Sequence, residues 1–343
     1  MIYIRADAND KIGIGHMMRC FAIAKALRRR GTEATFFVAD KSSAKMAAEA
    51  GFGYVCLGTD YDHMDQEADR LLQHMQERNV DHLLVDSYFV TEHYMNRIRE
   101  LARLAYLDDV NRFLYPCDLL INYNIYAESL RYPERYQAAG LATDFALGLS
   151  YMPLRDGYLS LEREPHEGFR ILLTTGATDR LGVVEAFLAA FTDSDLAGKT
   201  EVYAILGRYH EHREELRAKY GTVPGVHLLD PQPDLRALIA SCDIAVTAGG
   251  TTVYELCAGG LPAVLLTIAD NQMMAAQEFN RRGLIPYAGD VRTDMEGTVE
   301  RVLAEIRRAY ENPEKLQEKS RQLRTVIDGR GADRIAEALL AMR

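Results

Sequence analysis

The sequence predicts an α/β protein made of two doubly wound domains, each a parallel sheet with helices on both faces. Short apolar runs alternate with helical patterns along most of the 343 residues, which is typical of such sheets. The alternation pauses between Ser150 and Gly168 and then restarts, and the length suffices for two cores of ordinary size. We therefore expect two Rossmann-like domains facing a cleft, with a ligand at the carboxyl ends of their strands.

The first half begins with a short apolar run and an amphipathic helix. In this helix Cys20, Ile23, Ala24 and Leu27 repeat at the spacing of one helical face, and Gly31 follows as a C-terminal cap. Five strands are expected in this half: Ile2–Arg5, Thr35–Ala39, His82–Val85, Ala102–Leu107 and Leu119–Ile121.

A linker is expected where prolines and glycines stand among charged residues, between Ser150 and Gly168. The tail from Pro313 to Arg343 predicts helices that are broken around Gly329 and Gly331. We accordingly place the two domains at residues 1–155 and 166–343, with the last helix packing back on the first domain. Five strands are expected in the second half: Phe169–Thr175, Val202–Leu206, Val226–Leu229, Ile244–Thr247 and Ala263–Leu266.

Composition excludes several classes of partner. The net charge of -10 argues against a nucleic-acid or anionic-membrane surface, because both require a basic field. No long apolar stretch and no signal-like start is present, so neither a membrane span nor secretion is expected. Five cysteines without a CxxC pair suggest no zinc site and no disulfide framework, and fit a cytoplasmic location. Oligomeric state is left open.

A glycine-rich turn, KIGIGH, precedes the first helix and holds a candidate base. Gly13 and Gly15 are expected to give the backbone unusual freedom, and the spacing is not that of a dinucleotide fingerprint, so no nicotinamide cofactor is expected. His16 falls at the helix start, where the dipole disfavours imidazolium and leaves a neutral ring that accepts protons. Its other interpretation is a helix cap or a side chain packed beneath the loop.

A second turn, TAGGTTVYE, has the features of a phosphate site. Gly249 and Gly250 follow a strand, and Thr251 or Thr252 begins a helix whose free N–H groups and dipole suit an anion. Glu255 either accepts the hydroxyl protons of a ribose or closes a capping box with Thr252.

Two further polar stretches each have a structural alternative. Asn271 and Gln272 stand where a helix is expected to begin, and the simple explanation there is an N-cap by Asp270 or Asn271. Asp108 and Asp109 are an acidic pair at a strand end, more readily explained as a solvated turn than as metal ligands. No metal is expected.

Taken in order, the motifs resemble a known family. They are RADAxxxIGxGHxxR, VDSY, LDD, CDLLINYN, GLSYMPLR, TTGATD, and AGGTTVYE with ADNQ. The chain resembles, over nearly its whole length, UDP-2,4-diacetamido-2,4,6-trideoxy-β-L-altropyranose hydrolases of pseudaminic acid biosynthesis and relatives described as spore-coat polysaccharide biosynthesis proteins. That family is similar to the peptidoglycan N-acetylglucosaminyltransferase and shares its GT-B architecture.

The resemblance implies a role for each matching residue. His16 would be the general base and Glu255 the ribose ligand, while Gly249 to Thr252 would hold the diphosphate of a UDP-sugar. Asp86 and Tyr88 of VDSY, with Asn271 and Gln272, would lie around the sugar, although each also has a structural interpretation as a strand end or cap. The chain departs from the family pattern at Thr175–Asp179, where one glycine is missing.

The implied reaction is metal-independent attack of water on the anomeric carbon, with inversion and release of UDP. The helix start at Thr251 would meet the diphosphate charge, and His16 would activate water. Three rivals share the architecture: a UDP-sugar glycosyltransferase, a non-catalytic nucleotide-sugar-binding subunit and a UDP-sugar 2-epimerase. A lipid-acceptor transferase would be expected to carry a basic patch, for which Ala26–Glu33 is a small candidate.

Overall fold

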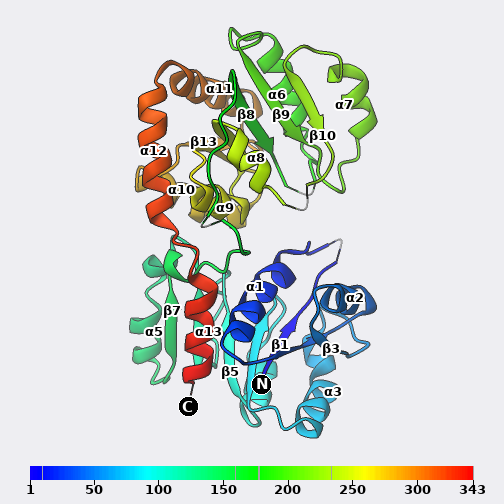
Figure 1. Ribbon diagram of the computed structural model, residues 1–343. Coiled ribbons are helices and arrows are strands. Elements are labelled where there is room, and N and C mark those ends of the chain that lie inside the picture. Colours follow the sequence, from blue (N-terminus) through cyan, green and yellow to red (C-terminus); the bar gives the residue numbers. More distant parts are fainter. Residues whose placement is uncertain (10, 159, 177, 233, 343) are drawn as a thin grey trace. The chain divides into compact units, whose positions relative to one another are not determined.

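The chain divides into two compact units in the computed structural model, which describes residues 1–9, 11–158, 160–176, 178–232 and 234–342 (Figure 1). Unit 1 comprises Met1–Asp156 and Gly329–Arg343, and unit 2 comprises Gly157–Asp328. The second half of the expected linker thus lies in unit 2. The C-terminal segment, which we numbered with the second domain but expected to pack back on the first, is part of unit 1.

Unit 1 is a parallel sheet covered by helices, with seven strands among its described residues in the order β3-β2-β1-β4-β5-β6-β7. The chain runs outward from β1 on one side and from β4 on the other, so the topological switch point lies between them. Its elements are β1 Ile2–Ala6, α1 Gly15–Arg29, β2 Ala34–Val38, α2 Lys41–Glu49, β3 Gly53–Cys56, α3 Met64–Glu77, β4 His82–Asp86, α4 Glu92–Arg99, β5 Arg103–Leu107, β6 Leu119–Asn122, η1 Ala127–Leu130, α5 Tyr132–Ala138, β7 Asp144–Leu147, η2 Leu149–Tyr151 and α13 Gly331–Ala341.

Unit 2 repeats this plan with six parallel strands in its described part, in the order β10-β9-β8-β11-β12-β13. Its switch point lies between β8 and β11. Its elements are β8 Phe169–Thr174, α6 Val183–Thr192, β9 Thr200–Ile205, α7 Arg213–Tyr220, β10 Val226–Leu229, α8 Arg236–Ser241, β11 Ile244–Ala248, α9 Thr252–Gly259, β12 Ala263–Thr267, η3 Asp270–Gln272, α10 Met273–Arg281, β13 Tyr287–Asp290, α11 Met295–Glu311 and α12 Pro313–Val326.

All ten strands expected from the sequence are present within a residue or two of their expected bounds. Three further strands, β3, β7 and β13, were not expected. Each is an edge strand of its sheet, and β3 (GYVC) is mostly exposed. An edge strand contacts one neighbour through its backbone and needs fewer buried side chains, so the apolar signal of these three strands is short.

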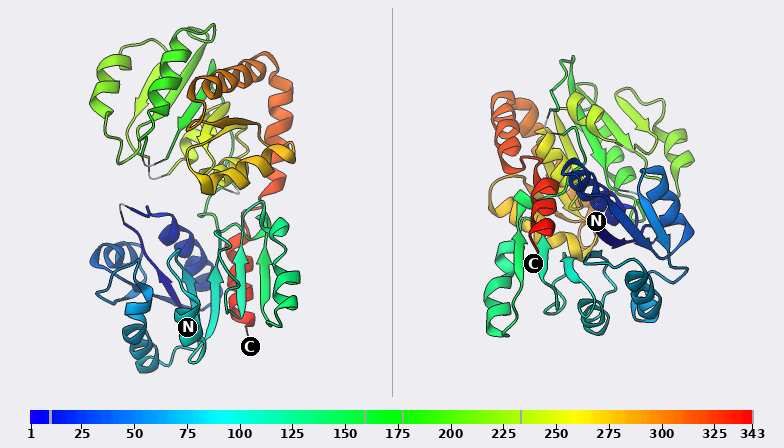
Figure 2. Two further views of the ribbon diagram at one scale, coloured as in Figure 1. Left: turned by 180° about the vertical axis from the view of Figure 1, so that it is seen from behind. Right: turned by 60° about the horizontal axis from the view of Figure 1, so that its bottom comes forward.

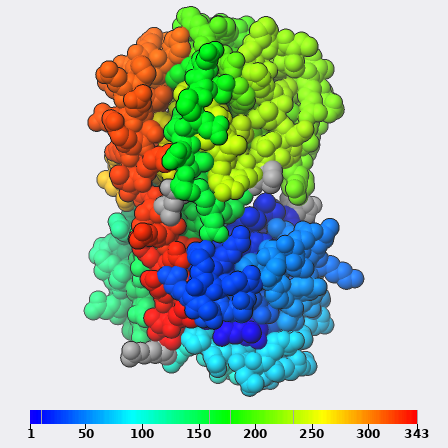
Figure 3. Space-filling view, in the orientation of Figure 1, coloured from blue at the N-terminus to red at the C-terminus, as the bar shows by residue number. Residues whose placement is uncertain are grey.

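Helix α13 packs alongside α1 within unit 1, as both ribbon views and the space-filling view show (Figures 2 and 3). Its first residue, Gly331, lies so close to Met152 that an added Cβ would come within 2.1 Å of the Met152 carbonyl oxygen. Asp333 bridges Arg29 (3.1 Å) and Arg30 (2.6 Å) at the end of α1. The end of the chain is thereby tied to the helix that begins at the glycine-rich turn.

Candidate functional site

Charged side chains gather at the carboxyl edge of the unit 1 sheet, beside its switch point. His16 and Arg19 lie in the first turns of α1, three residues apart and therefore on one helix face. Asp86 is the last residue of β4, and Asp109 and Tyr123 follow β5 and β6. Because β1, β4, β5 and β6 are successive neighbours in the sheet, their ends bring these residues together.

Asp86 is the centre of this network and is completely buried. Arg19 binds it with two nitrogens, Nε to Oδ2 at 2.6 Å and Nη2 to Oδ1 at 2.5 Å. Burial alone would raise the pKa of the Asp86 carboxyl, but the charge of Arg19 and the contact with His16 outweigh it and hold that pKa well below its usual range. Asp86 is therefore a fixed negative charge whose oxygens are occupied by protein donors.

His16 contacts Asp86 through Nδ1, which lies 2.6 Å from Oδ1. A lone pair on Nδ1 would face a carboxylate lone pair at this distance, so we assign the proton to Nδ1. Arg19 Nη2 also lies 2.9 Å from Nδ1. With both nitrogens protonated this is not a hydrogen bond, and the two groups are close because both donate to Asp86 Oδ1. No hydrogen-bond partner of Nε2 is found among the described residues, so in the neutral ring this nitrogen carries the free lone pair.

Tyr88, Asp109 and Tyr123 contact His16 and Arg19, two partners of Asp86. The Tyr88 ring packs edge-on against His16, with centroids 4.5 Å apart, and its hydroxyl donates to Asp109 Oδ2 at 3.2 Å. Arg19 Nη1 donates to the same oxygen at 3.1 Å and to the Tyr123 hydroxyl at 2.5 Å. Burial and the charge of Asp109 raise the pKa of Tyr88 well above its usual range, so its hydroxyl stays a donor.

The interpretation of Asp108 and Asp109 as a solvated turn is wrong. Asp108 is completely buried, where it accepts from the Tyr132 hydroxyl at 2.6 Å and from the backbone of Val110 and Asn111. Burial raises the pKa of the Asp108 carboxyl. Only 15% of the Asp109 side chain is exposed. Asp108 thus shapes the loop after β5, while Asp109 is part of the hydrogen-bond network of Arg19.

The glycines of the first turn differ in what they require. Gly13 adopts a φ of +72°, which favours glycine, and its N–H bonds Asn9 at 2.8 Å. Gly15 is the first residue of α1, where its φ is not positive and an added Cβ would meet nothing within 4 Å. The expected backbone freedom is therefore needed at Gly13 and not at Gly15.

In unit 2, the turn after β11 presents backbone donors. Helix α9 begins at Thr252 with Thr251 as its N-cap, whose side chain makes no cap hydrogen bond. No acceptor for the N–H groups of Thr251 and Thr252 is found among the described residues. At Gly250 an added Cβ would meet nothing within 4 Å, whereas at Gly249 it would come within 3.1 Å of Gln272. Gly249 thus allows the turn to pack closely against Gln272, and Gly250 leaves open space beside the N–H groups of Thr251 and Thr252.

The capping box proposed for Thr252 and Glu255 does not match the helix register. A capping box requires Thr252 at the N-cap position, but Thr252 is already the first helical residue. Glu255 lies in the first turn of α9 and is half-buried. Glu255 thus belongs to the same first helical turn as the backbone donors of Thr251 and Thr252.

The turn after β8 differs from the turn after β11, because a side chain of the protein caps the helix that follows it. Asp179 accepts from the backbone N–H of Val183 (2.9 Å) and Val184 (2.8 Å), so a protein carboxylate already occupies the start of α6. Gly176 has a φ of +101°, and Ala177, which belongs to the stretch where the chain departs from the family pattern, lies outside the described residues. Of the two helix starts beside the switch point, the one at α9 has the uncapped donors.

Asn271 and Gln272 lie in η3, immediately before α10. The N-cap of α10 is Gln272 rather than Asp270 or Asn271, and it makes no side-chain cap hydrogen bond. Gln272 Oε1 instead accepts from the backbone N–H of Ile268 at 2.9 Å, while Asn271 is exposed. Gln272 therefore shapes the turn that packs against Gly249.

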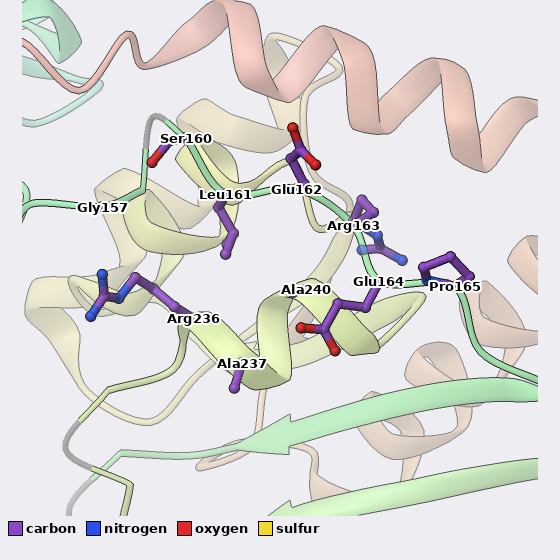
Figure 4. Close-up of a pocket in the computed structure, with 10 residues that line it drawn as sticks. All are labelled: Gly157, Ser160, Leu161, Glu162, Arg163, Glu164, Pro165, Arg236, Ala237 and Ala240. Atoms are coloured by element: carbon purple, nitrogen blue, oxygen red, sulfur yellow. The ribbon is translucent and has the colours of Figure 1, made fainter.

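A hollow of about 590 Å³ in unit 2 lies away from these residues, between the segment after Gly157 and helix α8. Figure 4 shows Leu161 pointing into it, with the guanidinium groups of Arg163 and Arg236 at opposite ends. None of the predicted site residues lines it. Across the described ranges, no group of three His, Cys, Asp or Glu side chains is placed to hold a metal, and no helix is long and apolar enough to cross a membrane.

Sequence reasoning identified His16, Asp86 and Tyr88, but it assigned no role to Arg19 or Tyr123 and interpreted Asp109 as part of a solvated turn. The GHxxR spacing was a usable signal, because a residue three positions after His16 shares its helix face. The approach of β5 and β6 to the same edge depends on strand order, which the motifs do not contain.

Comparisons with known proteins agree with this architecture. A model of the glycosyltransferase family 28 C-terminal domain matches residues 170–336. The spore coat polysaccharide biosynthesis protein SpsG of Bacillus subtilis is 23% identical, over 98% of this chain and 96% of its own length. A Helicobacter pylori protein described as pseudaminic acid cytidylyltransferase and UDP-2,4-diacetamido-2,4,6-trideoxy-beta-L-altropyranose hydrolase is 22% identical, over 82% of this chain and 47% of its own length.

Among solved structures, MurG of Acinetobacter baumannii superposes with a TM-score of 0.73 at 14% identity, covering 99% of each chain. At this identity the likeness concerns the fold. The chain therefore has the GT-B fold of two Rossmann-like domains, and it has distant relatives in spore-coat polysaccharide and pseudaminic acid pathways.

Proposed function

We propose that this protein is a nucleotide-sugar hydrolase that releases UDP from UDP-2,4-diacetamido-2,4,6-trideoxy-β-L-altropyranose. The observation that carries the proposal is the His16–Asp86 pair, in which a buried carboxylate holds Nδ1 and no described protein group hydrogen-bonds to Nε2. This is the arrangement of a general base whose tautomer and orientation are fixed by an acid. A non-catalytic binding protein does not need such a pair.

The nucleotide is assigned to unit 2. The N–H groups of Thr251 and Thr252, with the dipole of α9 behind them, suit the two phosphates of UDP, and Glu255 on the same helix suits the ribose hydroxyls. Gly250 keeps a side chain out of the open space beside these donors, and Gly249 lets the turn pack against Gln272. The name of the Helicobacter relative supports the choice of sugar.

In the proposed reaction the water oxygen forms a bond to the anomeric carbon while the bond from that carbon to the diphosphate oxygen breaks. His16 Nε2 takes the proton of the water, and UDP leaves with the bonding electrons. Donors at Thr251 and Thr252 meet the charge that develops on the leaving diphosphate. Attack opposite the leaving group inverts the anomeric centre. Asp86, whose oxygens are occupied by protein donors, acts on His16 rather than on the sugar.

The test is to incubate the purified protein with this UDP-sugar in ¹⁸O-labelled water without an acceptor. We expect equimolar UDP and free sugar, with the label in the sugar and the inverted anomer at early times. Label in UDP would indicate attack at phosphorus, and no release of UDP would contradict a hydrolase. Recovery of an isomerised UDP-sugar would indicate a 2-epimerase.

A glycosyltransferase is the second candidate, because the family model that matches residues 170–336 is a glycosyltransferase domain. In that case His16 would deprotonate an acceptor hydroxyl. The basic run proposed as a lipid-acceptor patch gives this candidate no support, since its three arginines are paired with acidic groups of unit 1. Arg28 pairs with Glu33, and Arg29 and Arg30 pair with Asp333. Release of UDP only after addition of a glycan or lipid acceptor would establish a transferase.

A further inference from the structure

The charges around His16 do not balance, and the excess comes from Asp109. Asp86 and Asp109 contribute two carboxylates to the network, and Arg19 contributes one guanidinium. Arg19 binds Asp86 with two nitrogens and Asp109 with one. With a neutral imidazole the cluster therefore carries one uncompensated negative charge.

That charge lies in surroundings that screen it weakly. The side chain of Arg19 is 6% exposed, that of Asp86 is fully buried and that of Asp109 is 15% exposed. The path from Asp109 to His16 has two short branches. One runs through Arg19, which contacts both residues, and the other through Tyr88, whose hydroxyl bonds Asp109 and whose ring packs on His16.

We propose that Asp109 is a further positioning residue of the reaction, which stabilises the imidazolium that forms when His16 takes a proton from water. This inference rests on the proposed function of His16 as the base. Proton transfer converts His16 from neutral to positive, and the cluster then becomes neutral overall. A buried site favours this change, because a balanced set of charges costs less to bury than an unbalanced one.

Other groups facing His16 do not supply this charge. Asp86 is matched by Arg19, and Arg19 itself opposes an imidazolium. Tyr88 and Tyr123 are neutral donors or acceptors, since burial raises the pKa of both hydroxyls well above their usual range. Burial and the charge of Asp86 likewise raise the pKa of the Cys20 thiol. Among these groups, Asp109 is thus the negative charge that can be removed without breaking the two-nitrogen contact between Arg19 and Asp86.

The test is the pH–rate profile of Asp109→Asn, in which the amide oxygen can still accept from Arg19 and Tyr88. We expect the acid limb to move to lower pH by about 0.5 to 1 pH unit, less than the ~1–3 units of a carboxylate in direct contact. A shift of about 0.5 to 1 pH unit corresponds to a factor of about three to ten in the proton affinity of His16. Plateau kcat should fall by up to this factor, with KM nearly unchanged. The titration midpoint of the His16 ring, followed by nitrogen NMR without substrate, should move in the same direction.

Asp118→Asn is the matched control. Asp118 is also half-buried (18% exposed) and also contacts arginines, but it precedes β6 and lies at the opposite edge of the sheet. Its acid limb and kcat should match the wild type. Asp109→Ser serves if the Asn variant does not fold.

Loss of rate with an unmoved acid limb and an unmoved NMR midpoint would overturn the role of Asp109. An active His16→Ala variant would instead overturn the proposed function, so the two failures are distinguishable.

Discussion

In unit 1 the carboxyl edge of the sheet carries charged side chains that are buried and paired with one another, whereas in unit 2 the same edge carries small residues and backbone donors. Asp86 has donors on both oxygens, and Thr251 and Thr252 have N–H groups without acceptors in the described part of the chain. A base needs a fixed tautomer and direction, which buried partners supply. A phosphate needs open donors, which an uncapped helix start supplies.

The largest effect that tests this contrast is expected for Asp86→Asn. The amide can donate to His16 Nδ1 through its NH₂ group, which favours the proton on Nε2 and removes the base. We expect kcat to fall by about 10²- to 10⁴-fold, the usual contribution of a general base, with a smaller change in KM. Nitrogen NMR of His16 should report the exchanged tautomer. A rate loss with the wild-type tautomer would mean that Asp86 acts only through stability.

Thr251→Pro tests the other side of the contrast. Thr251 has a φ of −64°, which proline adopts without strain, so the substitution removes one N–H donor and keeps the helix start. Hydrogen bonds to charged groups contribute about 1.5–3 kcal/mol, so UDP affinity should fall by roughly tenfold or more in calorimetric titration.

Thr251→Ala is the matched control for this substitution. It removes the hydroxyl and keeps the N–H, and it should lose less affinity than the proline variant. Equal losses would assign the contact to the hydroxyl.

Glu255→Gln is expected to have a smaller effect. If the carboxylate accepts from the ribose, affinity for UDP should fall about threefold to tenfold, since a charge-assisted bond becomes neutral. Binding of 2′-deoxy-UDP provides the control. If Glu255 contacts the 2′-hydroxyl, the loss of affinity from the substitution and the loss from the missing hydroxyl should not add, because both remove the same contact. Additive losses would place Glu255 away from the ribose.

No effect is expected from removing divalent metals. The proposed chemistry uses backbone donors and His16, so turnover in excess chelator should match that in untreated buffer. A loss of turnover that Mg²⁺ or Mn²⁺ restores would show that the diphosphate is neutralised by a metal.

The sequence predicted the interior strands and the two turns, but it predicted less of how side chains meet. Apolar runs identify β1, β4, β8 and β11 because interior strands bury both faces, while the edge strand β3 has only a short run, Tyr54 to Cys56, that is mostly exposed. Asp109 follows a predicted strand, yet its contact with Arg19 depends on which strands are neighbours. The capping box at Glu255 failed for a local reason, since the helix begins one residue after the N-cap at Thr251.

The most direct test of the account compares His16→Ala with the wild type in two assays on the same preparation. We predict that release of UDP from the UDP-sugar falls by at least about 10²-fold, because the base is lost. We also predict that the Kd for UDP stays within about twofold, because the nucleotide is held by unit 2. Turnover close to the wild-type rate would contradict the assignment of His16 as the base.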